Sequence, residues 1–443
     1  MGEAEHEVAP GDGLASRLEL VTESDDPGAR VSALSRITGW YRSVARFARG
    51  RALVRATRAV PRTLHFVGST MRSGEVSESL PAPHLTFGLA AQVAMDEALL
   101  AMAMAPRRFP HRADYGRVGG ELADAQAMYG RRGWRADPSS YHRAPPAISD
   151  ADVTASRGWA HGLRYDRWNW DSGFAPHPGE PGADRWMAFE PNRTASAAIV
   201  AHADGPRPWV IGTHGFCMGF PFMDFPGLQV ARLHRELGFN VALPILPLHG
   251  SRRVTRVSGE PFLSFDLMNA VHGLTQAVWD IRRLIQLVRQ QGATSISLYG
   301  ISLGAYVVSL LTGIEDGLDG VVAGIPVSDF PGLFHRHSPH HIRARSIEHR
   351  IMGGVAENVY QVVSPLSFAP RIPKSRRFIF AGYGDRLAMP DQAQRLWEHW
   401  DQSRISWYAG NHVGYMWSKQ VAEFLTTSLD GARVPDGLAV AGG

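Results

Sequence analysis

The chain has 443 residues, of which 44% are hydrophobic and 20% are charged. This composition provides for a large core and excludes a chain that is disordered throughout. A single cysteine, Cys217, excludes a disulfide framework and a cysteine-rich zinc site. The only lysines are Lys374 and Lys419, and neither follows a glycine, so a Walker-type phosphate loop is excluded as well.

Charge is segregated near the N-terminus. Residues 1–26 are acidic and carry no apolar run, so we expect a flexible head rather than a signal peptide. Residues 27–74 contain ten arginines and no acidic residue, whereas residues 75–443 are nearly neutral. The formal net charge of +4 is therefore a local property, and no nucleic-acid partner is expected for the body of the protein.

An amphipathic helix is predicted within the arginine-rich segment. Apolar residues recur at helical spacing over residues 34–48, and Arg42, Arg46 and Arg49 fall on the opposite face. One hypothesis is peripheral contact with an anionic membrane surface through residues 30–62. The alternative is a helix docked on the protein with its basic face in solvent. Residues 27–184 as a whole, rich in Arg and then in Trp, are expected to form a mainly helical extension, and residues 431–443 a flexible tail.

Residues 86–106 form the most apolar stretch of the chain. Gln92, Asp96 and Glu97 lie at its centre, and two carboxylates inside a bilayer would cost several kcal/mol. The stretch is therefore expected to be a buried helix rather than a membrane span. With one cysteine and no targeting signal, a cytoplasmic location is the default expectation, and the sequence leaves the oligomeric state open.

From residue 185 the pattern changes to short apolar runs that alternate with helical patterns. This alternation predicts an α/β fold with a doubly wound, mostly parallel sheet over residues 185–430. The runs are unbroken because helices cover both faces of such a sheet. The predicted strands are Ala195–Val200, Trp209–Gly212, Val241–Leu246, Ser295–Tyr299, Val321–Ile325, Phe378–Ala381 and Ile405–Tyr408.

The most specific motif is Gly300-Ile301-Ser302-Leu303-Gly304, between a predicted strand and a predicted helix. Strand, glycine-flanked serine and helix form the context of a nucleophile elbow. The glycines are needed because side chains two positions before and after the serine would clash in so tight a turn. Ser302 is thus the candidate nucleophile, held at the carboxyl edge of the sheet.

A serine nucleophile needs a base and a carboxylate that orients the base. His412 follows the last predicted strand, where such a sheet would carry the base. Asp385 follows the strand before it and completes the chain order Ser, Asp, His. The alternative acid is Asp329, which follows the strand Val321–Ile325.

The tetrahedral intermediate also needs N–H donors for its oxyanion. We expect them to be the backbone amides of Phe216, in the loop after the strand Trp209–Gly212, and of Leu303, directly after the nucleophile. Cys217 in the same loop lacks an elbow and is interpreted as a small hydrophobic residue.

These motifs resemble those of the α/β-hydrolase superfamily over roughly residues 185–430. His214-Gly215-Phe216, the Gly300–Gly304 elbow, Asp385 and His412 stand in the family's order. Asp280 with Arg282 and Arg283 resembles the esterase and prolyl-oligopeptidase-like branch. The resemblance implies a serine hydrolase, with a cap-like insertion at about residues 329–373.

Several residues near the predicted site could bind substrate. The loop after Trp209–Gly212 is rich in Phe and Met, which could line an apolar acyl pocket or simply pack the next helix. Arg252 could hold an anionic group or form a structural salt bridge. The candidate substrate-binding residues are His214, Met218, Phe220, His249, Arg252 and Tyr383.

No cofactor is expected. The five histidines between His335 and His349 fit no metal-binding signature, and no dinucleotide fingerprint follows a strand. The sequence thus predicts hydrolysis of a small-molecule carboxylic ester through an acyl-enzyme on Ser302, and it leaves the acyl group open, with an apolar or lipid-like one as an option. An acyltransferase or an amidase or peptidase would use the same residues. A rival hypothesis is a non-catalytic protein of this fold whose N-terminal arm binds a membrane or a partner.

Overall fold

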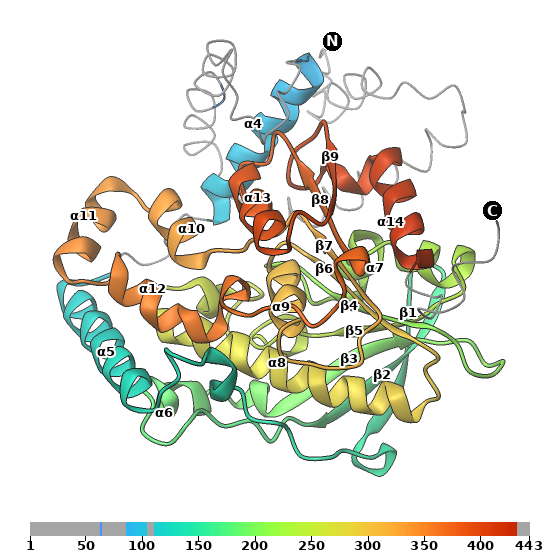
Figure 1. Cartoon of the computed structure of the whole chain (residues 1–443), viewed down its shortest axis with the longest axis horizontal. Coiled ribbons are helices and arrows are strands. Elements are labelled where there is room, and N and C mark those ends of the chain that lie inside the picture. Colours follow the sequence, from blue (N-terminus) through green and yellow to red (C-terminus); the bar gives the residue numbers. More distant parts are fainter. Residues whose placement is uncertain (1–62, 64–85, 104–109, 432–443) are drawn as a thin grey trace, which may run out of the picture.

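The computed structural model describes residue 63, residues 86–103 and residues 110–431 of the chain (Figure 1). The acidic head, the arginine-rich helix over residues 34–48 and the tail from residue 432 lie outside the described residues. The membrane hypothesis for residues 30–62 therefore remains a hypothesis. None of the described helices is long and apolar enough to cross a membrane.

A mixed sheet of nine strands forms the centre of the described part of the chain, with the order β1-β2-β3-β5-β4-β6-β7-β8-β9. The pairs β1–β2, β2–β3 and β3–β5 are antiparallel, and the remaining pairs are parallel. The predicted fold class is thereby confirmed, and each of the seven predicted strands is present. The strands are β1 (Thr154–Ala160), β2 (Leu163–Asp171), β3 (Thr194–Val200), β4 (Trp209–Thr213), β5 (Asn240–Pro244), β6 (Ile296–Ile301), β7 (Gly320–Gly324), β8 (Arg377–Gly382) and β9 (Arg404–Tyr408).

The sheet begins earlier in the chain than the sequence analysis expected. β1 and β2 lie inside the segment 27–184, which was expected to be mainly helical, and they pair as a hairpin at the edge of the sheet. A two-residue turn joins them at His161 and Gly162, both with positive φ, as a tight hairpin requires. The boundary at residue 185 was wrong because β1 is almost wholly exposed, so its residues show no apolar run.

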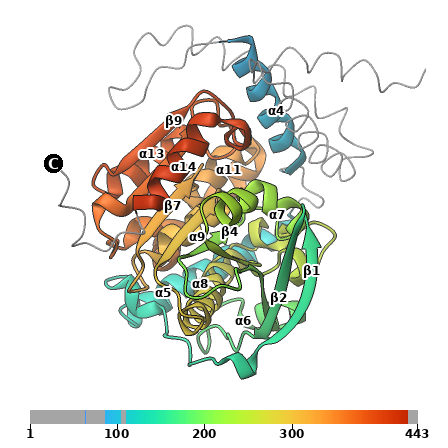
Figure 2. The same cartoon turned by 90° about the vertical axis from the view of Figure 1, so that its right-hand side faces the viewer.

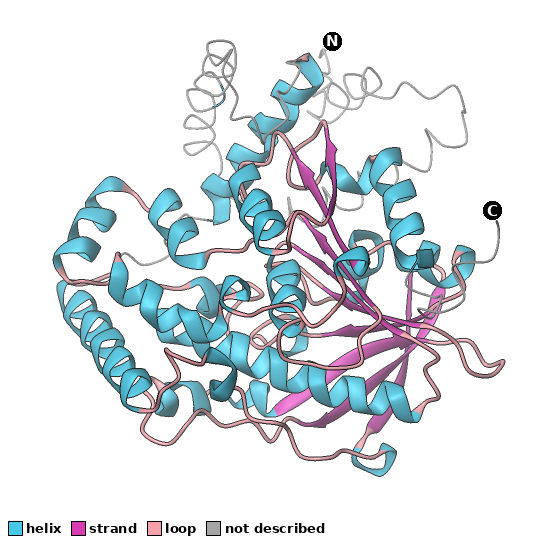
Figure 3. Cartoon of the chain, in the orientation of Figure 1, coloured by secondary structure: helices cyan, strands magenta, loops and turns pink. Residues whose placement is uncertain are grey.

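Helices cover both faces of the sheet (Figure 3). One face packs against α8 (Leu267–Gln290), α9 (Leu303–Leu311) and α13 (Pro390–His399), and the short α6 (Ala183–Met187) lies on the same side. Helix α5 (Arg112–Arg131) packs on α8 rather than on the sheet itself. The other face packs against α7 (Pro221–Gly227) and α14 (Lys419–Gly431).

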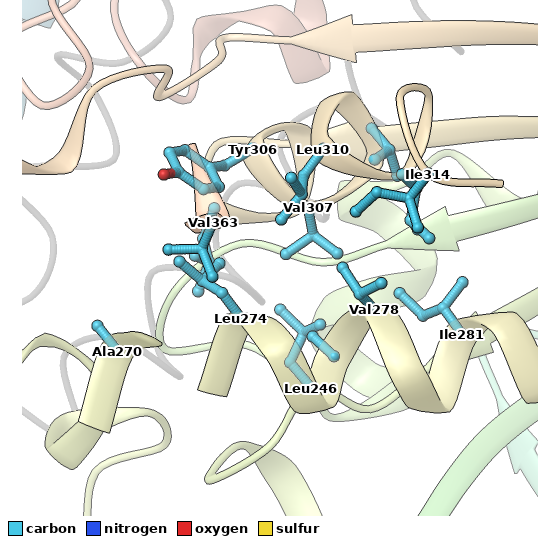
Figure 4. Packing of buried hydrophobic residues seen from close by; sticks show 14 of the residues in the cluster. Leu246, Ala270, Leu274, Val278, Ile281, Tyr306, Val307, Leu310, Ile314 and Val363 are labelled. Atoms are coloured by element: carbon cyan, nitrogen blue, oxygen red, sulfur yellow. The ribbon is translucent and has the colours of Figure 1, made fainter. Parts of the chain in front are cut away.

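The longest helix, α8, owes its position to an apolar stripe at helical spacing. Leu274, Val278 and Ile281 of α8 pack toward Val307 and Leu310 of α9, and all five side chains are buried (Figure 4). Successive members of each stripe are three or four residues apart, so they share one helix face. This packing holds the helix that begins at Leu303 firmly against the sheet.

A helical insertion separates β7 from β8, in the segment where a cap-like insertion was expected. It contains α10 (Phe330–His337), α11 (His340–Glu348) and α12 (Gly354–Tyr360), and it packs against α5 (Figure 1). The contact is close, since a side chain at Gly119 of α5 would lie 2.5 Å from the carbonyl oxygen of His349.

Helix α4 (Phe87–Ala103) lies on the outside of the body of the protein (Figures 1 and 2), and its hydrogen bonds go to the loops that follow β8 and β9. Asp96 and Glu97 at its centre are buried, as the sequence analysis expected. The helix therefore contacts the carboxyl edge of the sheet, where the candidate residues lie.

Candidate active site

The backbone at Ser302 makes a strained turn between β6 and α9. Its φ is 54° and its ψ is −115°, a combination that a residue with a side chain rarely adopts. The amide of Ser302 donates to the carbonyl oxygen of Gly324 in β7, at 2.9 Å, which ties the turn to the neighbouring strand. The serine thus leaves the sheet at its carboxyl edge and directly precedes a helix N-terminus.

Both glycines of the elbow are required by close backbone contacts. A Cβ at Gly300 would lie 2.3 Å from the carbonyl oxygen of Gly304. A Cβ at Gly304 would lie 2.0 Å from the carbonyl oxygen of Thr213, at the end of β4. Real Cβ atoms do not approach oxygen so closely, so only glycine fits either position.

The loops after β8 and β9 bring Asp385 and His412 into contact. The Nδ1 atom of His412 lies 2.7 Å from Oδ2 of Asp385, and both side chains are buried. The second oxygen of Asp385, Oδ1, accepts the backbone N–H groups of Leu387 and Ala388 at 2.9 and 2.8 Å. These two backbone hydrogen bonds fix the carboxylate, so that Oδ2 faces Nδ1 of His412 as an acceptor. The imidazole therefore carries its proton on Nδ1, and Nε2 is the basic nitrogen.

The pKa of His412 is raised above its ordinary value of 6.5. Burial acts to lower this pKa, but the negative charge of Asp385, its hydrogen bond and the charge of Asp96 together act more strongly in the other direction. The site therefore stabilises the imidazolium that would form when His412 accepts a proton.

The alternative acid, Asp329, lies elsewhere. Its side chain accepts the N–H of Gly332 at 3.0 Å and so caps α10, and it pairs with Arg395 at 3.0 Å. Of the two candidate acids, the geometry places Asp385 on the histidine.

The three loops converge at the carboxyl edge of the sheet. A Cβ at Gly215 would lie 3.5 Å from Cβ of Ser302, so the loop after β4 packs directly on the elbow. Tyr415, three residues after His412, donates to the carbonyl oxygen of Gly227 at 2.8 Å, which ties the histidine loop to the end of α7. Within the described residues, neither the Ser302 hydroxyl nor Nε2 of His412 makes a hydrogen bond, and none joins the two to each other. Catalytic hydrogen bonds of this kind often tighten only when substrate binds.

The loop after β4 can supply the oxyanion donors. Among the residues that the structure describes, no acceptor takes up the backbone N–H of Phe216 or of Leu303. His214 fixes the loop, since Nδ1 donates to the carbonyl oxygen of Gly215 at 2.8 Å and Nε2 accepts the N–H of Leu246 at 3.1 Å. Burial lowers the pKa of His214 to about 4, so its ring stays neutral in this role.

The same loop is held from its far end by Asp224. Its Oδ1 accepts the N–H of Gly219 at 3.0 Å, and burial raises the pKa of this carboxyl to about 7. Cys217, between the two anchored ends, is half-buried and has a φ of 65°. The loop is thus shaped by hydrogen bonds at both ends.

Three of the expected substrate-binding residues are buried, and for them the expectation was wrong. Arg252 pairs with Asp280 at 2.8 Å and donates to two backbone carbonyl oxygens. Of its two predicted roles, the structure therefore supports the structural salt bridge, and the buried guanidinium does not face a substrate. His214 and His249 are also inaccessible. Their rings lie behind the oxyanion loop, 5.2 Å apart between centroids, and the ring of His249 lies 5.9 Å from that of Phe216.

The other three candidates keep part of their surface accessible. Met218 and Phe220 are half-buried, and Phe220 stacks on Phe222, which is 48% exposed. The guanidinium of Arg253 lies 5.4 Å from the centre of the Phe220 ring. Tyr383, also half-buried, stacks on Trp407 with ring centroids 5.6 Å apart. These rings form apolar surface near the carboxyl edge.

Sequence reasoning missed one part of the site. Asp96 of α4 accepts the backbone N–H of His412 at 2.9 Å, and Gln92 accepts that of Asn411 at 3.1 Å. The buried carboxylate in an apolar helix was the available signal, but nothing in the sequence indicated which loop it would contact.

The described residues contain no group of three or more His, Cys, Asp and Glu side chains that could hold a metal ion. In the histidine-rich insertion, His337 instead contacts the carbonyl oxygen of Leu387 at 2.9 Å. The insertion is thereby linked to the loop that carries Asp385.

Sequence comparison finds no matching family model. It does find two relatives in Mycobacterium tuberculosis, the uncharacterized proteins MT2702 and Rv2627c. Each is 38% identical over 365 residues, which cover 82% of this chain and 87% of the relative. The chain belongs to the family of these two proteins.

The described sheet has the α/β-hydrolase fold that the sequence motifs implied. The strand order, the elbow after β6, the aspartate after β8 and the histidine after β9 carry this assignment.

Solved structures of similar fold include an acetyl xylan esterase from Paenibacillus sp. R4 (TM-score 0.45, 14% identity, 66% of this chain and 98% of that one). An acylaminoacyl peptidase from Pyrococcus horikoshii has a TM-score of 0.39 and 14% identity, and the match covers 63% of this chain and 40% of that one. Esterase B from Lactobacillus Rhamnosis has a TM-score of 0.40 and 14% identity, and the match covers 71% of this chain and 96% of that one.

Replacement of Gly304 by alanine should disrupt the elbow, because the new Cβ would meet the carbonyl oxygen of Thr213. We expect the rate at which a fluorophosphonate labels Ser302 to fall at least about 100-fold, since a displacement near 1 Å has this effect on a reacting group. The matched control is Gly116→Ala in α5, where a Cβ meets nothing within 4 Å. The control should label normally and gain about 0.5–1 kcal/mol in unfolding free energy. Normal labelling of Gly304→Ala would contradict the described elbow.

Proposed function

We propose that this protein is a serine hydrolase that cleaves carboxylic esters through an acyl-enzyme on Ser302. The observation that carries the proposal is the buried 2.7 Å contact between Asp385 and His412, at the same sheet edge as a serine in a strained elbow. If the pair of Asp385 and His412 served only stability, it would not need a serine at the same sheet edge. If the turn at Ser302 served only to connect β6 to α9, it would not need a strained backbone.

In the first step, the hydroxyl oxygen of Ser302 attacks the ester carbonyl carbon and its proton passes to Nε2 of His412. Asp385 holds the imidazole in the correct tautomer and stabilises the imidazolium. The carbonyl oxygen becomes an oxyanion, and the amides of Phe216 and Leu303 would donate to it. When the intermediate collapses, the bond to the alcohol oxygen breaks and the alcohol leaves with the proton of His412.

The second step releases the acid. A water molecule gives one proton to Nε2 of His412 as its oxygen attacks the acyl carbon, and the same two amides stabilise the second oxyanion. Collapse of this intermediate breaks the bond to Ser302, which recovers its proton from His412. The products are a carboxylic acid and an alcohol, and the enzyme returns to its starting state.

An apolar acyl group is the substrate feature that the surface supports best. Met218, Phe220 and Phe222 extend from the oxyanion loop into α7 and expose apolar surface beside the site. Apolar surface of this kind binds hydrocarbon in proportion to the area removed from water.

A fluorophosphonate probe tests the nucleophile directly. The full chain should be labelled once, at Ser302, and Ser302→Ala should not be labelled. The labelling rate should fall as the pH is lowered, with a midpoint above 6.5, because a protonated His412 cannot accept the serine proton and its pKa is raised. A folded protein that remains unlabelled at every pH would favour the non-catalytic alternative.

The choice of acid is tested by a matched pair of substitutions. Asp385→Asn should slow labelling by about 10³- to 10⁴-fold, since the amide no longer enforces the Nδ1–H tautomer. Asp329→Asn should leave the labelling rate within about two-fold, because Asp329 caps α10 and touches neither Asp385 nor His412. The reverse ranking would transfer the role of the acid to Asp329.

A further inference from the structure

Helix α4 places a buried carboxylate beneath the two loops that carry Asp385 and His412. The Oδ2 atom of Asp96 accepts the backbone N–H of His412 at 2.9 Å and that of Arg386 at 3.0 Å. The Oδ1 atom accepts the side-chain amide of Asn411 at 2.9 Å. Asp96 has no exposed surface, and these three hydrogen bonds all go to the two loops.

Neighbouring residues on the same helix face strengthen this contact. Gln92, one turn before Asp96, accepts the backbone N–H of Asn411 through its side chain and the Asn411 side-chain amide through its backbone oxygen, at 3.1 and 2.9 Å. Glu97 pairs with Nε of Arg386 at 3.0 Å and is itself 2% exposed. A Cβ at Gly384 would lie 2.7 Å from Leu89, so the backbone next to Asp385 approaches the helix closely.

The burial of the Asp96 carboxylate between α4 and the two loops calls for a physical explanation. Burial of a carboxylate is costly unless donors compensate for the lost water, and an apolar helix could pack on the loops without one. Here three donors compensate, and they come from two separate loops. Arg386 adjoins Asp385, and the other two donors belong to Asn411 and His412.

We propose that Asp96 is a positioning residue of the Asp385–His412 pair. It joins the backbone of His412 to the backbone that follows Asp385 and thereby fixes the distance between the imidazole and its carboxylate. The role rests on the proposed function, because positioning matters only if His412 acts as the base for Ser302. It would also make helix α4, from the N-terminal quarter of the chain, part of the catalytic assembly.

Asp96 also acts through its charge. The described ionisable groups that face it are Asp385 and Arg386 from the loop after β8, Tyr408 and His412 from the end of β9 and its loop, and Glu97 on α4 itself. The negative charge of Asp96 raises the pKa of His412. Burial first, and then the charge of Asp385, raise the pKa of Asp96 to about 7. Asp96 therefore carries its full charge only above about pH 7, and removal of that charge should lower the pKa of His412.

The test compares fluorophosphonate labelling of Ser302 as a function of pH in the full chain and in Asp96→Asn. We expect the plateau rate of the variant to fall by about 10- to 100-fold, because the asparagine cannot accept all three donors. We also expect the acid midpoint to move to lower pH, which a loss of packing alone would not produce. The matched control is Asp319→Asn, which removes a carboxylate that accepts the N–H of Ile296 at the opposite end of β6 from Ser302. The control should retain the wild-type rate and midpoint.

A second variant separates position from charge. Asn411→Ala removes one donor to Asp96 but leaves the carboxyl group in place, so it should lower the plateau rate and move the acid midpoint less than Asp96→Asn does. Folded Asp96→Asn with the rate and midpoint of the wild type would overturn the inference. If Asp96→Asn does not fold, a wild-type rate in Asn411→Ala overturns it instead. An unlabelled wild-type protein would overturn the proposed function and this inference with it.

Discussion

The close approach of three backbone segments at the elbow is the constraint on which the site depends. Ser302 can occupy its strained conformation because Gly300 and Gly304 let the start of α9 press against the end of β4. The strain at Ser302 is maintained by surrounding packing, above all by α8 and α9 on one face of the sheet. The same approach brings the loop after β4 onto Ser302, so the candidate nucleophile and the proposed oxyanion donors share one rigid support.

The histidine and its acid are held by a different means. They lie on loops, and loops need fixed hydrogen bonds to achieve the precision that strands supply through packing. Asp385 is fixed by two backbone amides, while Asp96 fixes the backbone on which His412 stands. Two buried carboxyl groups near one imidazole also stabilise its protonated form, which the proposed reaction produces when His412 accepts the proton of Ser302.

Much of the fold could be predicted from the sequence because it depends on local patterns. Buried parallel strands appear in the sequence as unbroken apolar runs. The elbow is indicated by the glycines two positions before and two positions after Ser302. β1 escaped the same reasoning because an exposed edge strand needs few apolar residues, and β2 escaped it because most of its side chains are exposed or half-buried. The substrate-binding roles of His214, His249 and Arg252 were wrong for a related reason, since burial depends on what packs over a loop. The role of Asp96 depends on contacts with residues 290 to 316 positions away, which one sequence does not reveal.

The central claim is that Ser302 carries a covalent acyl group during turnover, and mass spectrometry of the protein mixed rapidly with an activated acetate ester tests it most directly. We expect the mass of the wild-type protein to increase by one acetyl group, located on the peptide that contains Ser302. The increase should appear in Asp385→Asn only after much longer mixing, and it should be absent from Ser302→Ala. Ester hydrolysis at an undiminished rate by folded Ser302→Ala, or acetylation that persists when Ser302 is replaced, would contradict it.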